Sequence, residues 1–143
     1  MIDHFTVSVA DLAATRAFYD KVLAPLGYTL QRDYEVIVGY GFKRPYLWFK
    51  QAAVATTPQH IAFRAMSREA VDAFHAAALA AGAKDDGAPG VREHYHPQYY
   101  GAFVIDPLNG HPIEAVYHGE PPAPAKTAKR KPAAKKKAKK KKR

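Results

Sequence analysis

Hydrophobic and polar residues alternate at the start of the chain, from His4 to Val9. Such alternation predicts a strand with one buried face, and it places the side chain of His4 on the opposite, polar face. The apolar spacing then changes to that of a helix, with Asp11 positioned to accept hydrogen bonds from the first backbone amides. Pro25 and Gly27 predict the end of this helix.

The same pattern recurs 56 positions later, where His60-Ile61-Ala62-Phe63 aligns with His4-Phe5-Thr6-Val7. Ser67 takes the place of the capping Asp11, and Gly82 closes the second helix. Three strand-like segments follow each helix: 29–32, 35–40 and 46–50 in the first half, and 91–95, 102–105 and 113–117 in the second. We therefore predict an α+β domain of two βαβββ modules, residues 1–51 and 58–118, that form a curved mixed sheet.

The composition is that of an ordinary globular protein, with 48% hydrophobic residues and no cysteine. The lack of cysteine excludes disulfides, thiolate metal ligands and a cysteine nucleophile. No apolar run is long enough for a membrane span, and the first residues lack the pattern of a secretory signal. We therefore expect a cytoplasmic protein with no membrane partner.

Positive charge is concentrated at the end of the chain. Residues 126–143 contain 12 of the 22 lysines and arginines and no acidic residue, which leaves 10 basic against 13 acidic side chains in 1–125. We expect residues 119–143 to be a disordered basic tail on a slightly acidic domain. The tail predicts non-specific binding of nucleic acid or another polyanion, and the alternative is a solubilising extension without a partner.

Three side chains are candidates for metal ligands. His4 and His60 occupy equivalent positions of the repeat on the polar strand face, and Glu114 is an acid within the apolar segment 113–117. Two imidazoles and a carboxylate suit a divalent iron, manganese, nickel or zinc ion, and three protein ligands leave positions open for water or substrate. The alternative is a metal-free pocket in which these residues only form hydrogen bonds.

The order of these motifs resembles the vicinal oxygen chelate superfamily, the glyoxalase/bleomycin resistance protein/dioxygenase family. The resemblance covers about residues 2–118 and rests on His4, Asp11-Leu12 before Phe18-Tyr19, His60, and Asp106-Pro107 followed by Ile113-Glu114. It implies His4, His60 and Glu114 as ligands of a metal-dependent lyase, isomerase, transferase or dioxygenase, in which the metal acts as a Lewis acid on vicinal oxygens of a small substrate. The alternative is a metal-free protein that sequesters a small molecule, as bleomycin-resistance proteins do. The modules pair either within one chain or between the chains of a homodimer.

The first module lacks a counterpart of Glu114. Aligning Pro45-Tyr46-Leu47 with Pro112-Ile113-Glu114 places Leu47 where a four-ligand glyoxalase I would have its first carboxylate, which argues against that reaction. We expect Leu47, Trp48 and Arg64 to line the substrate pocket.

The segment 94–100 is rich in aromatic and polar residues, and loops of this kind often line sites. His94 and His96 are candidates for proton transfer because the ordinary pKa of histidine lies near neutrality, and Tyr100 is a third catalytic candidate. The alternative is a solvated loop with packed tyrosines. His75, on the second predicted helix, is expected to be exposed.

Overall fold

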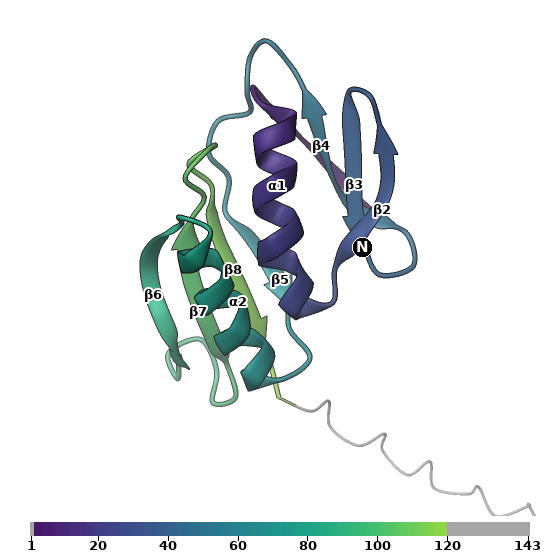
Figure 1. Ribbon diagram of the computed structural model, residues 1–143. Coiled ribbons are helices and arrows are strands. Elements are labelled where there is room, and N and C mark those ends of the chain that lie inside the picture. Colours follow the sequence, from purple (N-terminus) through teal and green to yellow (C-terminus); the bar gives the residue numbers. More distant parts are fainter. Residues whose placement is uncertain (1, 120–143) are drawn as a thin grey trace, which may run out of the picture.

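The computed structural model describes residues 2–119, and the predicted basic tail lies outside this part from residue 120 on. Each half of the chain forms four strands and one long helix, which confirms the predicted α+β class and the two βαβββ modules (Figure 1). The first module contains β1 (Phe5–Val9), α1 (Leu12–Leu23), the short 3-10 helix η1 (Ala24–Leu26), β2 (Thr29–Tyr34), β3 (Ile37–Gly41) and β4 (Pro45–Gln51). The second contains β5 (Ile61–Arg64), α2 (Arg68–Ala80), β6 (Lys84–Val91), β7 (Tyr100–Ile105) and β8 (Pro112–Tyr117).

Each module folds into its own four-stranded mixed sheet. The strand orders are β1-β4-β3-β2 and β5-β8-β7-β6, in which the first strand of each module runs parallel to the last and the other neighbours are antiparallel. β1 and β5 are edge strands that do not pair with each other. Within residues 2–119 the sheet surface therefore consists of two ladders that meet at these two edges.

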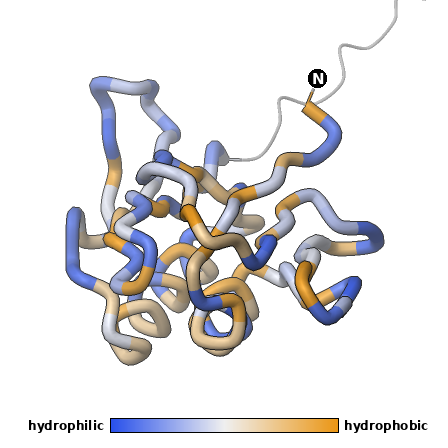
Figure 2. The backbone as a smooth tube through the Cα atoms, turned by 90° about the horizontal axis from the view of Figure 1, so that it is seen from above, coloured by the Kyte–Doolittle hydropathy of each residue, from blue (hydrophilic) through white to orange (hydrophobic). Residues whose placement is uncertain are grey.

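Both helices cover the same side of the two sheets and pack against each other (Figures 1 and 2). The apolar residues of the strands and helices that meet there form one core, which includes Val7, Val9, Phe18, Val22, Phe49, Phe63, Val71, Phe74, Ala102 and Ile113. Side chains alternate along a strand, so the residues between these core positions point away from the helices. His4 and Glu114 are among the residues that face this way. No helix among residues 2–119 is long and apolar enough to span a membrane.

The predicted helix caps are confirmed. A side-chain oxygen of Asp11 accepts a hydrogen bond from the amide of Ala14 at 2.9 Å, and Ser67 does the same for Ala70 at 3.2 Å. Each bond satisfies an amide that has no partner within its own helix. Gly27 follows α1 and η1 with a φ of 79°, the left-handed conformation that favours glycine.

One strand of the second module was wrongly predicted. The structure has β6 at Lys84–Val91, whereas residues 92–99 form the loop before β7. The segment 84–91 contains Gly87, Pro89 and Gly90, which are poor strand formers. They are tolerated because β6 is an edge strand and its register with β7 is interrupted twice, by irregularities between Asp85 and Gly87 and between Gly87 and Gly90.

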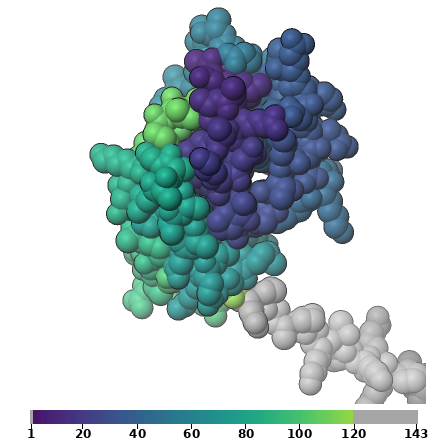
Figure 3. Space-filling model, viewed as in Figure 1, coloured from purple at the N-terminus to yellow at the C-terminus, as the bar shows by residue number. Residues whose placement is uncertain are grey.

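Helix α1 also joins the two modules. The hydroxyl of Tyr19 donates to Asp106 at 3.1 Å, across 87 positions of the chain. Asp106, which is 1% exposed, also accepts from the backbone amides of Leu108 and Asn109, so one carboxylate holds the β7–β8 turn and the helix together. Figure 3 shows α1 lying against both the second module and the β2–β3 hairpin.

Candidate functional site

The open face of the second sheet brings His60 and Glu114 together. β5 pairs Ala62 with Glu114, so His60, two residues before Ala62, lies on the same face. His60 Nε2 is 3.0 Å from Glu114 Oε2. The side chain of Glu114 is 4% exposed and that of His60 is 54% exposed. A buried carboxylate is thus paired with an imidazole that solvent and ligands can reach.

Tyr99 supplies the second partner of this carboxylate. Its hydroxyl donates to Oε1 of Glu114, and burial, with the hydrogen bond and charge of Glu114, raises the pKa of the phenol. Gly101 leaves the space for this contact, because a Cβ there would lie 3.2 Å from Oε1 of Glu114 and 3.1 Å from the Tyr99 ring. Each oxygen of Glu114 therefore has a donor, as burial of a carboxylate requires.

The hydrogen bond gives the two ring nitrogens of His60 different roles. A carboxylate only accepts, so Nε2 carries the hydrogen and Nδ1 of the neutral ring keeps its lone pair. His60 also lines a groove of about 480 Å³ between the free edges of β1 and β5, whose apolar walls include Phe5, Val7 and Ile61. The site therefore places a half-exposed imidazole, held at Nε2 by a buried carboxylate, beside a mainly apolar cavity.

His4 lies apart from this pair. Its Nδ1 is 2.8 Å from Asp3, and it lines a separate cavity with Trp48. In the part of the chain from residue 2 to 119, no three histidine, aspartate or glutamate side chains converge in a group that could hold a metal ion. Within a single chain the structure brings His60 and Glu114 together but leaves His4 apart, so one chain does not form the predicted three-ligand centre.

The strand register corrects the predicted alignment of the two modules. β1 pairs Thr6 with Trp48, whereas β5 pairs Ala62 with Glu114. Since Thr6 and Ala62 are equivalent in the repeat, Trp48 and not Leu47 is the counterpart of Glu114. Leu47 belongs to the core and is 3% exposed, so the prediction that it lines a substrate pocket is wrong. Trp48 does line a cavity, the one that contains His4.

The other predicted candidates do not reach the His60–Glu114 pair. The hydroxyl of Tyr100 donates to Asp72 of α2 at 2.8 Å, so Tyr100 lies on the helix side of the sheet. His94 packs on Tyr95, with ring centroids 4.2 Å apart. Arg64 is exposed at the end of β5 and lines neither of the two cavities described above.

His96 lies one side chain away from the site. Its Nε2 is 2.8 Å from Nδ1 of His118, and its ring packs on Tyr99 with centroids 5.3 Å apart. His96 therefore contacts the tyrosine that holds Glu114 rather than the carboxylate itself. His75, expected to be exposed, is 8% exposed and pairs through Nε2 with Asp85 at 3.0 Å, which ties α2 to β6.

Tyr99 is the residue beside Glu114 that the sequence analysis did not single out, although the alternation of side chains along the strand indicated its position. Ala102 and Val104 of β7 are buried toward the helices, so Tyr100 shares their face. Tyr99 lies four positions before Phe103, so the two side chains point to the same face of the sheet. Phe103 pairs directly with Glu114. The alternation of β7 therefore selects Tyr99 rather than Tyr100 for the open face.

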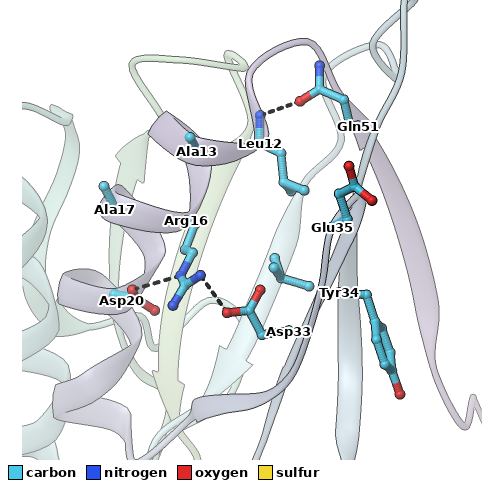
Figure 4. A pocket seen from close by; sticks show the side chains of 10 residues that line it. Leu12, Ala13, Arg16, Ala17, Asp20, Asp33, Tyr34, Glu35 and Gln51 are labelled. Carbon is cyan, nitrogen blue, oxygen red and sulfur yellow. Dashed lines mark hydrogen bonds and ion pairs between the residues drawn. The ribbon is translucent and has the colours of Figure 1, made fainter.

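A further cavity, of about 700 Å³, lies on the helix side of the first sheet, between α1 and the β2–β3 hairpin (Figures 3 and 4). Arg16 extends from α1 across it, donates to Asp33 at 2.6 Å and lies 3.7 Å from Asp20 (Figure 4). Asp20 also accepts from the hydroxyl of Tyr40 at 2.8 Å. Because these charges are paired with one another, we assign the cluster a structural role in holding α1 to β2.

Known proteins with this fold are similar in sequence as well. The family model described as "Glyoxalase/Bleomycin resistance protein/Dioxygenase superfamily" matches residues 1–115. A glyoxalase/bleomycin resistance protein from Albidiferax ferrireducens is 29% identical and has a TM-score of 0.72, with 80% of this chain and 97% of that chain covered. No curated protein matches the chain.

Two more distant structures share the fold. A glyoxalase/bleomycin resistance protein/dioxygenase family enzyme from Burkholderia phytofirmans is 21% identical with a TM-score of 0.64, over 82% of this chain and 98% of that chain. A glyoxalase-related enzyme from Fulvimarina pelagi is 18% identical with a TM-score of 0.63, over 82% of this chain and 87% of that chain. The likeness thus extends over nearly the whole length of each of these proteins.

Proposed function

Because the chain belongs to the glyoxalase/bleomycin resistance protein/dioxygenase superfamily, we propose that it is an enzyme that moves a proton on a small organic substrate. Membership of the superfamily supports a small-molecule ligand. The observation that carries the proposal is the 3.0 Å contact between His60 Nε2 and the buried Glu114, made by a half-exposed imidazole that lines a groove.

In this proposal His60 is the general base. Glu114 orients the imidazole and stabilises the positive charge that it acquires when Nδ1 takes up a proton. A carbon–hydrogen bond next to a substrate carbonyl loses its proton to Nδ1, and the electron pair of that bond moves into the enolate. Return of the proton to another atom gives an isomer, and return to the same carbon gives exchange with solvent.

Tyr99 is a positioning residue in this scheme. Its hydroxyl holds the Glu114 carboxylate from the side opposite His60. Burial and the nearby carboxylate raise the pKa of Tyr99, so the phenol keeps its hydrogen at neutral pH and continues to donate. The carboxylate is thereby held in one orientation while the imidazole changes charge.

The test is exchange of carbon-bound hydrogen for deuterium, followed by NMR in heavy water. The probes are pyruvate, hydroxyacetone and phenylpyruvate, each compared with buffer alone. The protein should accelerate exchange of at least one probe, and His60→Asn and Glu114→Gln should each reduce the acceleration by about 100-fold or more. His94→Asn is the matched control, because His94 packs on Tyr95 outside the site. Exchange that persists in His60→Asn would contradict the proposal.

A second candidate is binding without turnover, as in a sequestering protein. The aromatic side chains Tyr34 and Trp48 in the His4 cavity favour it, because they offer an apolar surface to a ligand beside the charged lining residues Asp3 and Arg44. If none of the probes exchanges faster than in buffer while the cavity still takes up a ligand, this second function replaces the first.

A further inference from the structure

Arg92 lies on the open face of the second sheet, at the edge opposite β5. Its backbone amide donates to the carbonyl of Tyr99 at 2.8 Å, which extends the pairing of β6 with β7 by one residue. Its guanidinium carbon lies 5.5 Å from the centroid of the Phe103 ring. Phe103 pairs with Glu114, and its ring centroid is 6.4 Å from that of His60. Arg92 and His60 therefore flank one side chain of the proposed active site.

Two glycines of β6 leave the room for this guanidinium. A Cβ on Gly90 would lie 2.8 Å from Arg92 Nη1, and a Cβ on Gly87 would lie 3.5 Å from Nη2. Gly87 pairs with Phe103 and Gly90 with Gly101, so both lie beneath the open face. Glycine within a strand often marks the close approach of another group. Here that group is the arginine side chain, which gives a reason for the glycines that make β6 a poor strand by its sequence.

The guanidinium forms no ion pair with an acidic side chain among residues 2–119. Nη2 donates to the carbonyl of Ala88 at 2.7 Å, and Nη1 donates to that of Val91 at 3.4 Å. These two bonds orient the group and use two of its five N–H donors. The other donors have no acceptor within the described part of the chain, and the residue is partly exposed. The open face thus holds a fixed positive charge with donors to spare.

The charge of Arg92 acts on the site, but the site does not need it for neutralisation. It lowers the pKa of Tyr99, against the larger effects of burial and of Glu114, which raise it. The guanidinium is therefore close to the Tyr99 hydroxyl. Both oxygens of Glu114 already have donors in His60 and Tyr99. Arg92 is available for an anion that the described residues do not supply.

We infer that Arg92 binds an anionic group, a carboxylate or a phosphate, of the substrate on which His60 acts. The position of the reacting carbon rests on the proposed function of His60, whereas the contact with the anion depends only on Arg92. The planar guanidinium matches two oxygens of either anion. Because the two side chains flank Phe103, a molecule of a few carbon atoms can reach both. The substrate class is thus a small carbonyl compound that carries a carboxylate or a phosphate.

Matched pairs of anionic and neutral probes test this contact without any need for turnover. The pairs are pyruvate with pyruvamide, phenylpyruvate with phenylpyruvamide, and hydroxyacetone phosphate with hydroxyacetone, so carboxylate and phosphate are compared. NMR titration of the full chain follows the backbone amides of Gly87, Gly90 and Gly101, which lie around the guanidinium. At least one anionic probe should shift these signals to saturation. It should bind about 10-fold more tightly than its neutral partner, because hydrogen bonds to charged groups are the stronger ones.

Two arginine variants make the test specific. Arg92→Gln should weaken binding of the anionic probe by about 10-fold and leave that of the neutral probe unchanged. A purely structural role of Arg92 would not cause this loss of discrimination. Arg68→Gln is the matched control, because Arg68 lies over the Tyr100 ring, 5.0 Å from its centroid, on the helix side of the same sheet. Both variants keep the basic residues 126–143, so binding of anions there cannot account for a difference between them.

Equal binding of anionic and neutral probes by the parent protein would overturn the inference, as would the lack of any anionic probe that shifts the three glycine amides. An Arg92→Gln variant that binds the anion as tightly as the parent does would also overturn it. A parent that prefers anions through Arg92 but exchanges no protons contradicts the proposed function and leaves the anion contact in place. One that exchanges protons but does not discriminate between the members of each pair contradicts the anion contact alone.

Discussion

Glu114 and His111 are both almost fully buried, yet their polar atoms are satisfied to different degrees. Glu114 has a donor for each oxygen. His111 accepts at Nδ1 from the backbone amide of Gln59 at 3.0 Å, while its Nε2 has no partner among the residues that the structure describes. Burial lowers the pKa of His111, against a smaller opposing effect of the Asp106 charge. The folded protein therefore favours a neutral ring at this position.

This residue predicts a pH dependence of stability. The unfolded chain protonates His111 near pH ~6.5, and the folded state does so only at lower pH. The free energy of unfolding should therefore be independent of His111 above that pH and should fall as the pH drops below it. His111→Asn keeps an acceptor for Gln59 but cannot titrate, so it should lose less stability between about pH 7.5 and pH 5.5. Urea unfolding of both proteins at these two pH values measures the difference, and equal losses would contradict the prediction.

Leu47 gives a second prediction, about packing. Because it is 3% exposed in the core, Leu47→Ala should lower the free energy of unfolding by about 2–5 kcal/mol. Leu47→Glu should destabilise the protein more, since it buries a carboxylate without a partner. Trp48 is half-buried and is the counterpart of Glu114 in the first sheet. Trp48→Glu should therefore lower the free energy of unfolding less than Leu47→Glu does. Denaturant titration ranks the variants, and near-parental stability of Leu47→Glu would mean that the β1–β4 register is wrong.

Among the elements, the two helices begin in the same way although they share little sequence. Asp11→Ala and Ser67→Ala each remove one side-chain acceptor from a helix N-terminus. Each change should therefore lower the free energy of unfolding by about 1 kcal/mol. Asp11→Asn and Ser67→Thr retain an acceptor and serve as controls. Thermal and urea unfolding measure the four variants, and a cap variant as stable as its control would show that the bond contributes nothing.

Elements defined by local patterns were predictable from the sequence, and those defined by distant contacts were not. The alternation of β1 and the capped stripes of α1 and α2 are properties of short segments, so they could be read without a structure. β6 exists because β7 pairs with one side of it, and its own residues argue against a strand. The position of His4 relative to Glu114 depends on how two separate sheets are placed, which no local pattern specifies.

At the scale of the whole molecule, one helix connects the two halves. Tyr19 reaches Asp106 of the second module, and α1 packs on α2. Two modules that share a core and a buried hydrogen bond are expected to unfold together. The two modules are thus repeats in sequence and fold, but we expect them to unfold in a single transition.

Charge is divided unequally between this domain and the end of the chain. Residues 2–119 contain 10 basic and 12 acidic side chains, whereas 126–143 contain 12 basic and none acidic. Deleting 126–143 should therefore abolish binding to random DNA, while the intact chain should bind with an affinity that falls steeply with salt. Fluorescence anisotropy with labelled DNA at several salt concentrations measures both, and circular dichroism checks that the deletion leaves the domain folded. Affinity that survives the deletion would require a basic surface on the domain.

Trp48 and Glu114 stand at one and the same position of two otherwise matching halves. This one difference makes the two ends of the open surface chemically distinct. In the proposed function, a molecule that lies across β1 and β5 meets the indole of Trp48 at one end and the imidazole of His60, held by Glu114, at the other. If His60 is the base, only the orientation that brings the substrate carbonyl to His60 is productive. The proposed preference for one orientation of the substrate therefore originates in the one position at which the two halves differ.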